Sequence, residues 1–212
     1  FQQVLTAYIG REPANRVLAG QIRRGDVITR QAAIGFADLR GFTAASQRLD
    51  AEEFLALIGT FFENTCDCVY GERGEVLKFM GDGVLFIIAD DGNPSQTCDR
   101  ALRSVEALTK AIDQHNASTD GLPIRFGCAL HYGAVLYGNI GSPARLDFTV
   151  VGSAVNLTAR LESLTSKVDE VCLVSQDFSD LTSMETRRVG EFELKGLSEP
   201  QAAYAPLLTT QP

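Results

Sequence analysis

Two aspartates of this chain lie at the ends of apolar runs, where a carboxylate needs a cation or a hydrogen-bond donor. Asp38 ends an apolar run that begins at Ile28, and Asp82 lies in a Gly81-Asp82-Gly83 turn that follows a second apolar run. A carboxylate at the end of a buried strand is costly to desolvate unless a cation or a hydrogen-bond donor meets it. Two converging carboxylates offer the hard oxygen ligands that Mg²⁺ and Mn²⁺ prefer. The pattern predicts a divalent-metal site, provided that the fold brings both residues together.

The order of the predicted elements supplies that convergence. Periodicity and turn residues predict, in order, a strand, a helix, two strands, a helix and two more strands, at residues 28–37, about 50–71, 75–79, 84–89, 94–117, 124–132 and 135–140. The first six form the split βαβ arrangement of ferredoxin-like folds, in which a helical crossover makes the first two strands parallel. Asp38 and Asp82 then lie at one edge of the sheet. On its own, Gly-Asp-Gly is also simply a good hairpin turn.

Further segments flank this core on both sides. Residues 1–28 are predicted to form a helical connector that is broken near Gly10 and Pro13. After the core we expect a helix and three short strands, at residues 152–166, 172–175, 187–194 and 202–207. The predicted fold class is therefore α+β, with a ferredoxin-like βαββαβ core and a C-terminal α/β extension in one domain over residues 29–212.

Composition narrows the possible partners. The 212 residues carry a net charge of −8, which argues against a nucleic acid polymer. A nucleotide is still possible, because a metal and a few local cations can dominate a site. No apolar run approaches about 18 residues and no signal peptide is visible, so we expect a chain that neither inserts into a membrane nor is secreted.

The cysteines and the first residue add two expectations. Five cysteines, an odd number, lie in apolar regular segments and are predicted to be reduced, buried thiols of a cytoplasmic protein. The chain opens on Phe1 rather than Met, so we expect an upstream part that could hold a regulatory domain or a membrane tether.

Four segments together resemble the catalytic domain of the class III nucleotidyl cyclases, the adenylate and guanylate cyclases. They are residues 36–43 (FADLRGFT), 77–83 (LKFMGDG), 147–162 (DFTVVGSAVNLTARLE) and 193–197 (ELKGL), and the resemblance covers roughly residues 30–207. It implies that a nucleoside triphosphate becomes a 3′,5′-cyclic nucleotide and pyrophosphate. It also implies two metal ions, Mg²⁺ or Mn²⁺, held by Asp38, Asp82 and the backbone carbonyl of Leu39. Two ions suit this chemistry because they activate the 3′-hydroxyl and neutralise the phosphates.

The resemblance assigns further residues to the nucleotide. Asn156 and Arg160 lie four residues apart on a predicted helix, so they share one face. By resemblance Asn156 orients the ribose, and Arg160 stabilises charge on the α-phosphate, for which a guanidinium is well suited. Lys195 is implied for the terminal phosphates and Arg145 for the triphosphate. Without the surrounding motifs, Arg160 would be a solvated helix residue, paired with a neighbouring carboxylate, and Lys195 a surface lysine.

Lys78 and Thr149 are implied to recognise the base, and their chemistry favours adenine. Adenine presents an acceptor at N1 and a donor at N6, whereas guanine reverses both. Lys78 can only donate and the Thr149 hydroxyl can accept, so the pair matches adenine and leaves polar groups unpaired against guanine. Guanylate-producing members carry Glu and Cys at these positions. Thr149 resembles a subgroup that includes bicarbonate-responsive soluble cyclases, although no bicarbonate-binding pattern is visible.

The resemblance also implies an assembly. In this family the metal aspartates come from one subunit, and the residues for base, ribose and transition state come from its partner. This chain holds every element, so a homodimer would have two equivalent sites and a monomer none. The expected function is that of an adenylate cyclase acting on ATP. Two alternatives stay open: a catalytically silent nucleotide-binding regulatory domain on the same scaffold, and a guanylate cyclase.

Overall fold

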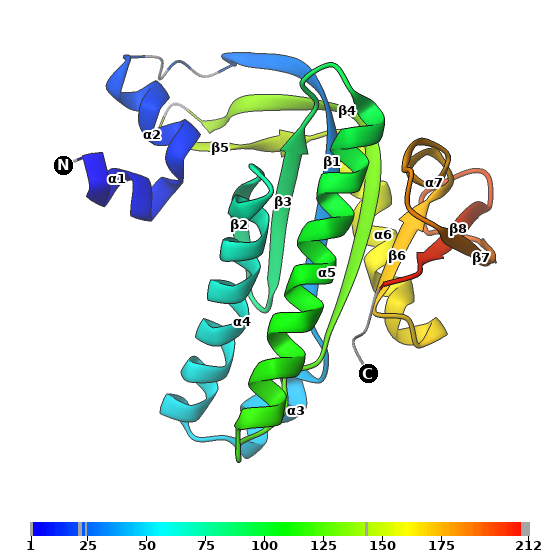
Figure 1. Ribbon diagram of the computed structural model, residues 1–212. Coiled ribbons are helices and arrows are strands. Elements are labelled where there is room, and N and C mark those ends of the chain that lie inside the picture. The colour runs from blue at the N-terminus through cyan, green and yellow to red at the C-terminus, as the bar shows by residue number, and fades with distance from the viewer. Residues whose placement is uncertain (1, 21–22, 24, 143, 209–212) are drawn as a thin grey trace.

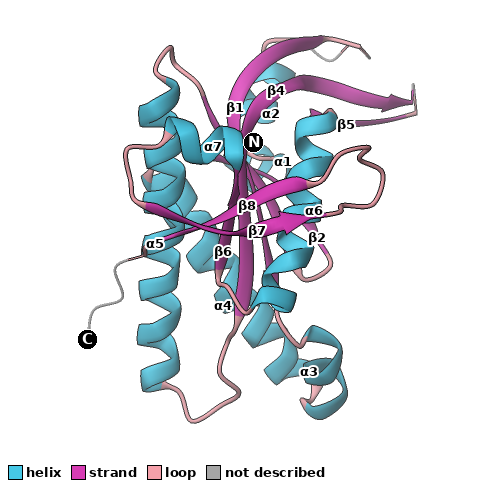
Figure 2. Cartoon of the chain, turned by 90° about the vertical axis from the view of Figure 1, so that its right-hand side faces the viewer, coloured by secondary structure: helices cyan, strands magenta, loops and turns pink. Residues whose placement is uncertain are grey.

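A mixed β-sheet runs through the centre of the molecule, with helices on both faces (Figure 1). The computed structural model describes residues 2–20, 23, 25–142 and 144–208. Neighbouring strands follow the order β2 (Glu75–Met80), β3 (Gly83–Ala89), β1 (Val27–Leu39), β4 (Phe126–Ser142), β6 (Cys172–Ser175), β8 (Gln201–Pro206) and β7 (Thr186–Phe192), and β5 (Arg145–Val151) pairs with β4. Helices α4 (Ala51–Gly71) and α5 (Pro94–Ser118) cover one face, and α6 (Ser153–Val168) lies on the other (Figure 2).

The predicted ferredoxin-like core is confirmed. Strand β3 lies antiparallel between β1 and β2, and β4 pairs antiparallel with the other side of β1. The helices of the core also begin and end close to the predicted residues. Asp50 caps α4 by accepting from the Glu53 backbone at 2.9 Å, while the Glu53 side chain accepts from the Asp50 backbone at 3.2 Å. This reciprocal capping box fixes the start of α4, and Gly71 is its last residue.

Two sequence predictions were wrong in this part of the fold. The strands expected at 124–132 and 135–140 are one continuous strand, β4, whose hairpin partner is β5. Gly133 does not turn the chain, because it stays extended and pairs with Ala32 of the 13-residue strand β1. Pro13 does not break the connector either. It lies in the first turn of α2 (Arg11–Leu18), where a missing backbone N–H removes no helical bond, and Gly10 alone separates α2 from α1 (Gln2–Ile9).

The C-terminal extension follows the predicted order, with short strands β6, β7 and β8. Two short helices were not predicted: α3 (Phe42–Arg48) and α7 (Gln176–Leu181). All five cysteines carry free thiols, but only Cys98, Cys128 and Cys172 are buried, since Cys66 and Cys68 are partly exposed on α4. Among the described residues, no helix combines the length and apolarity that crossing a bilayer requires.

Strand alternation decides which face of the sheet carries the site. Ala33, Ala37 and Leu39 of β1 belong to the core beneath α4 and α5. Ala32 and Ile34 belong to a second core with Tyr137 and residues of β5. Because successive side chains on a strand point to opposite faces, Asp38 shares the face of Ala32 and Ile34. Asp38 therefore lies on the side of the sheet that α4 and α5 leave uncovered.

Candidate active site

The two aspartates meet at one end of the sheet. Asp38 is the last but one residue of β1, and its cross-strand partner is Gly83, the residue after Asp82. The Leu39 N–H donates to the Asp82 carbonyl at 3.3 Å, which fastens the β2–β3 turn to the end of β1. A Cβ on Gly83 would lie 3.3 Å from Asp38 Oδ1, so a glycine at this position leaves the carboxylate its room. The convergence expected from the topology is present.

The carboxylates of Asp38 and Asp82 together favour the binding of a cation. Burial, followed by the negative charge of Asp82 and a side-chain hydrogen bond with it, raises the pKa of Asp38 to about 6. Asp38 Oδ1 is buried and has no hydrogen-bond partner among the described residues. A buried, unpartnered carboxylate oxygen beside a second carboxylate fits a divalent ion.

The side chains alone would not complete the coordination of such an ion. Within the described part of the chain, no group of three or more His, Cys, Asp or Glu side chains could hold a metal. Further ligands would have to be backbone carbonyls, such as that of Leu39, and oxygens of a bound phosphate.

A third carboxylate, which sequence analysis missed, faces the same pocket. Glu162 of α6 lines a pocket of about 480 Å³ together with Asp38, Leu39 and Arg40. Burial raises the pKa of Glu162 to about 7, the charges of Asp38 and Asp82 add to the rise, and Arg40 opposes it. Helical periodicity could have indicated that Glu162 faces the sheet, because it lies four residues after the buried Thr158 on one face of α6.

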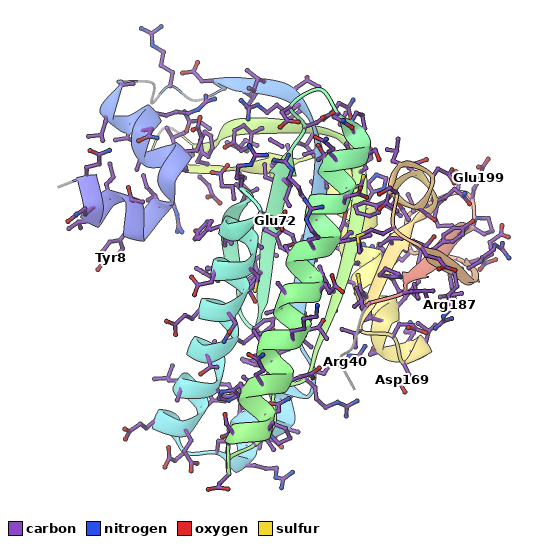
Figure 3. The ribbon with its side chains drawn as sticks, viewed as in Figure 1. Tyr8, Arg40, Glu72, Asp169, Arg187 and Glu199 are labelled. Atoms are coloured by element: carbon purple, nitrogen blue, oxygen red, sulfur yellow. The ribbon has the colours of Figure 1, made fainter. Side chains whose placement is uncertain are left out.

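Arg40 ties this end of β1 to the segment after α6. Its guanidinium donates to the Glu170 carbonyl, and Nη1 lies 3.7 Å from Asp169 Oδ1. Arg40 and Asp169 lie close together at the lower end of α6 (Figure 3). Arg40, one of the two arginines that line the pocket around Asp38, is therefore already engaged with the protein.

Lys78 lies on β2 and Thr149 on β5, two strands that do not pair in the sheet, and the residue that Lys78 contacts on β5 is an unexpected one. The Lys78 ammonium contacts the Asp147 carboxylate, not the Thr149 hydroxyl. Asp147 and Thr149 are two residues apart on β5 and so share one face, and Thr149 is only 8 % exposed. Sequence analysis missed Asp147, although it opens the segment 147–162. Its spacing of two residues from Thr149 was the available signal.

The remaining predicted residues lie apart from the aspartates. Asn156 and Arg160 are exposed one turn apart on α6, Arg145 is exposed at the start of β5, and Lys195 is exposed in the loop between β7 and β8. In the described part of the chain Arg160 forms no ion pair, so the alternative of a surface ion pair finds no support. The described lining of the Asp38 pocket contains none of these four residues.

A second pocket contains Lys78, one of the two residues expected to contact the base, whereas Thr149 is not part of its described lining. It measures about 380 Å³ and is lined by Lys78, Asp147 and Phe148, with residues of α1 and α2 closing one side. Among the described residues, no residue lines both this pocket and the pocket of Asp38. One chain thus presents the two halves of the expected site in separate places.

Comparison with known proteins gives a consistent result. The family model of the adenylate and guanylate cyclase catalytic domain matches residues 28–205. An adenylate cyclase of Anabaena cylindrica is 32 % identical over 149 residues, which cover 69 % of this chain and 30 % of that protein. The chain therefore spans about a third of the length of this relative.

Solved structures include cyclases of both kinds. The structure of a bacterial light-regulated adenylyl cyclase superposes with a TM-score of 0.85 at 23 % identity and covers 99 % of this chain and 61 % of that one. The guanylyl cyclase Cya2 superposes with a TM-score of 0.75 at 27 % identity and covers 88 % of this chain and 96 % of that one.

Proposed function

The chain belongs to the family of adenylate and guanylate cyclase catalytic domains, and we propose that it converts ATP to 3′,5′-cyclic AMP and pyrophosphate. The observation that carries the proposal is the meeting of Asp38 and Asp82, with a buried Asp38 oxygen that no described residue satisfies. On a cyclase scaffold, a pair of carboxylates that lacks a compensating cation fits a metal site for phosphate chemistry better than a structural role.

In this proposal each residue has a separate task. Asp38, Asp82 and the Leu39 carbonyl would hold two ions, Mg²⁺ or Mn²⁺, which supply the charge that activates the 3′-hydroxyl and neutralises the phosphates. Arg160 donates to the α-phosphate as negative charge grows there, and Asn156 orients the ribose. Of the residues that the resemblance assigns to the nucleotide, Lys195 and Arg145 are left for the triphosphate, and both are exposed.

The base pocket favours ATP over GTP. Lys78 donates to N1 of adenine, while the Thr149 hydroxyl and the Asp147 carboxylate both accept and can receive the N6 amino group. With guanine the same groups meet mismatched partners, since O6 would face acceptors and the N1–H would face a lysine donor. The contact between Lys78 and Asp147 supports this assignment, because it keeps donor and acceptor side by side.

The site we propose is shared between two copies of the chain. Asp38 and Lys78 line separate pockets, and Asn156 and Arg160 are exposed on α6. Strands β2 and β5, which carry the proposed base residues, also expose apolar side chains that a second copy could cover. Phe79 is 51 % exposed and Met80 41 % on β2, and Leu146 is 37 % exposed on β5. A head-to-tail homodimer would bring the aspartates of each copy to the base pocket of the other.

The direct test is to identify the product. Purified protein is incubated with Mn²⁺ and either ATP or GTP, and nucleotides are separated by chromatography. We expect cyclic AMP from ATP, little product from GTP, and loss of turnover in Asp82→Asn but not in a control variant of the exposed Asp120, Asp120→Asn. Preference for GTP would replace the proposal by a guanylate cyclase. Nucleotide binding without turnover would indicate a silent regulatory domain.

A further inference from the structure

The connector packs against the strands that carry the base pocket. Figure 1 shows α2 beside the hairpin end of β4 and β5. Pro13 and Ala14 of α2 are buried, Ala14 completely. One turn further, Arg16 places its guanidinium carbon 5.2 Å from the ring centroid of Phe148 and 5.8 Å from that of Tyr137. A cation at this distance is attracted to an aromatic ring, more strongly where water is excluded.

Both partners of this contact are held in place. Arg16 Nε donates to Glu12 Oε1 at 3.2 Å, and the Arg16 side chain is only 17 % exposed. The Tyr137 ring is fully buried and meets Phe148 edge-on, with centroids 4.8 Å apart. The Tyr137 hydroxyl in turn donates to Glu75 on β2. Arg16 therefore contacts a pair of rings that is anchored in the sheet.

Phe148 stands between the two acceptors of the proposed base pocket. Asp147, which contacts Lys78, precedes it, and the buried Thr149 follows it on β5. Neighbouring residues of a strand move together, so a displacement of Phe148 displaces both acceptors relative to Lys78 on β2. Phe148 also lines the base pocket, whose other side the connector closes.

We propose that Arg16 is a positioning residue for the base pocket. Through Phe148 it sets the place of Asp147 and Thr149, so that the position of the connector determines the affinity for ATP. This inference rests on the function proposed above for the same pocket. The connector acts on binding rather than on the chemical step, because Asp38 of the proposed metal site lines a different pocket.

Three variants test the inference: Arg16→Ala, Arg16→Lys and, as a control on an exposed connector residue, Arg23→Ala. KM for ATP, kcat and the Kd of an unreactive ATP analogue are measured for each. We expect Arg16→Ala to raise KM and Kd about three- to tenfold, as loss of a partly desolvated cation–π contact implies, with kcat changed less than about twofold. Arg16→Lys should recover most of the affinity, since it keeps the cation, and Arg23→Ala should match the wild type.

A double-mutant cycle with Phe148→Leu identifies the route. If Arg16 acts through Phe148, Arg16→Ala adds little to the KM of Phe148→Leu. The inference is overturned if KM and Kd are unchanged in Arg16→Ala, or if the two substitutions have additive effects in the cycle. In either case the proposed function still holds as long as the protein forms cyclic AMP. A loss in kcat together with a lower melting temperature also overturns it. If the wild type binds the analogue without turnover, the Kd values still decide. Neither binding nor turnover in the wild type rejects both proposals.

Discussion

Asp38 and Asp82 repel each other in the metal-free chain, and burial of Asp38 increases the cost of that repulsion. The pKa of Asp38 is about 6 in the folded chain against 3.8 for a free side chain, so the folded state binds its proton more tightly than the unfolded state does. The stability that protonation provides is complete below about pH 4 and is lost as the pH rises through 6. A bound divalent cation would remove this loss, because it compensates both charges.

This titration gives a measurable stability prediction. Between pH 5 and pH 7 the melting temperature of the metal-free wild type should fall relative to that of Asp38→Asn. At pH 7, Mn²⁺ at about 100 times its Kd should stabilise the wild type by about 2.7 kcal/mol, or about 5–10 °C in melting temperature. Differential scanning fluorimetry measures both effects. An equal shift by Mn²⁺ in Asp38→Asn would place the ion elsewhere.

In the proposed function, base selection depends on Lys78. In Lys78→Met the apolar stem is kept and the donor is lost, which should lower kcat/KM for ATP about 10- to 100-fold and reduce the preference for ATP over GTP. Steady-state assays with both nucleotides check this. Lys110→Met is the matched control, because Lys110 pairs with Glu106 one turn away on α5 and is not part of the described lining of either pocket. An unchanged ratio of ATP to GTP turnover would remove Lys78 from base recognition.

Single residues differ in how far the sequence alone could predict them. Asp38 and Asp82 were predictable because topology brings the end of β1 to the β2–β3 turn. Spacing gave only a weak signal for Asp147 and Glu162, since the importance of each depends on a charge from a different element: Lys78 for Asp147 and Asp38 for Glu162. Only the folded chain brings such partners together.

Among the secondary-structure elements, the β2–β3 turn is the one that positions Asp82 next to the end of β1. Gly81 has φ 66, a left-handed conformation that costs a residue with a side chain about 1–2 kcal/mol, although a Cβ there would meet open space. The strain of Gly81→Ala therefore comes from the backbone rather than from a clash. It acts on the residue directly before Asp82.

Gly81→Ala should lower both stability and activity. The expected loss is about 1–2 kcal/mol in the free energy of unfolding, with a fall in kcat as the Asp82 carboxylate moves. Gly59→Ala, on the exposed side of α4, is the matched control and should stabilise by about 0.5–1 kcal/mol. Urea unfolding and cyclic AMP assays measure the two quantities. A Gly81→Ala protein as stable as the wild type would mean that the turn can adopt another conformation.

The elements also show where local reasoning fails. Gly133 reads as a turn residue, yet pairing with β1 on one side keeps β4 extended through it. Long-range pairing outweighed local propensity there. Capping and helix length, by contrast, are local, and α4 and α5 lie close to their predicted bounds.

At the scale of the whole molecule, the residues of the proposed site lie in two separate places on one chain. Asp38 and Leu39 line one pocket and Lys78 and Asp147 another, while the connector closes the second. The homodimer that we propose to join them was implied by family resemblance and not by any pattern in the sequence, because each half of a shared site looks incomplete by itself. Activity per molecule should therefore rise with protein concentration as dimers form.

Mixing Asp38→Ala with Arg160→Ala tests the shared, metal-bearing site most directly. Each variant alone should form no cyclic AMP. In an equimolar mixture, half of the dimers would be mixed and would carry one intact site each, which predicts about a quarter of the wild-type activity. Mixing either variant with itself at the same total concentration is the control. A mixture as inactive as its components, with mixed dimers demonstrated by differently tagged chains, would contradict the account.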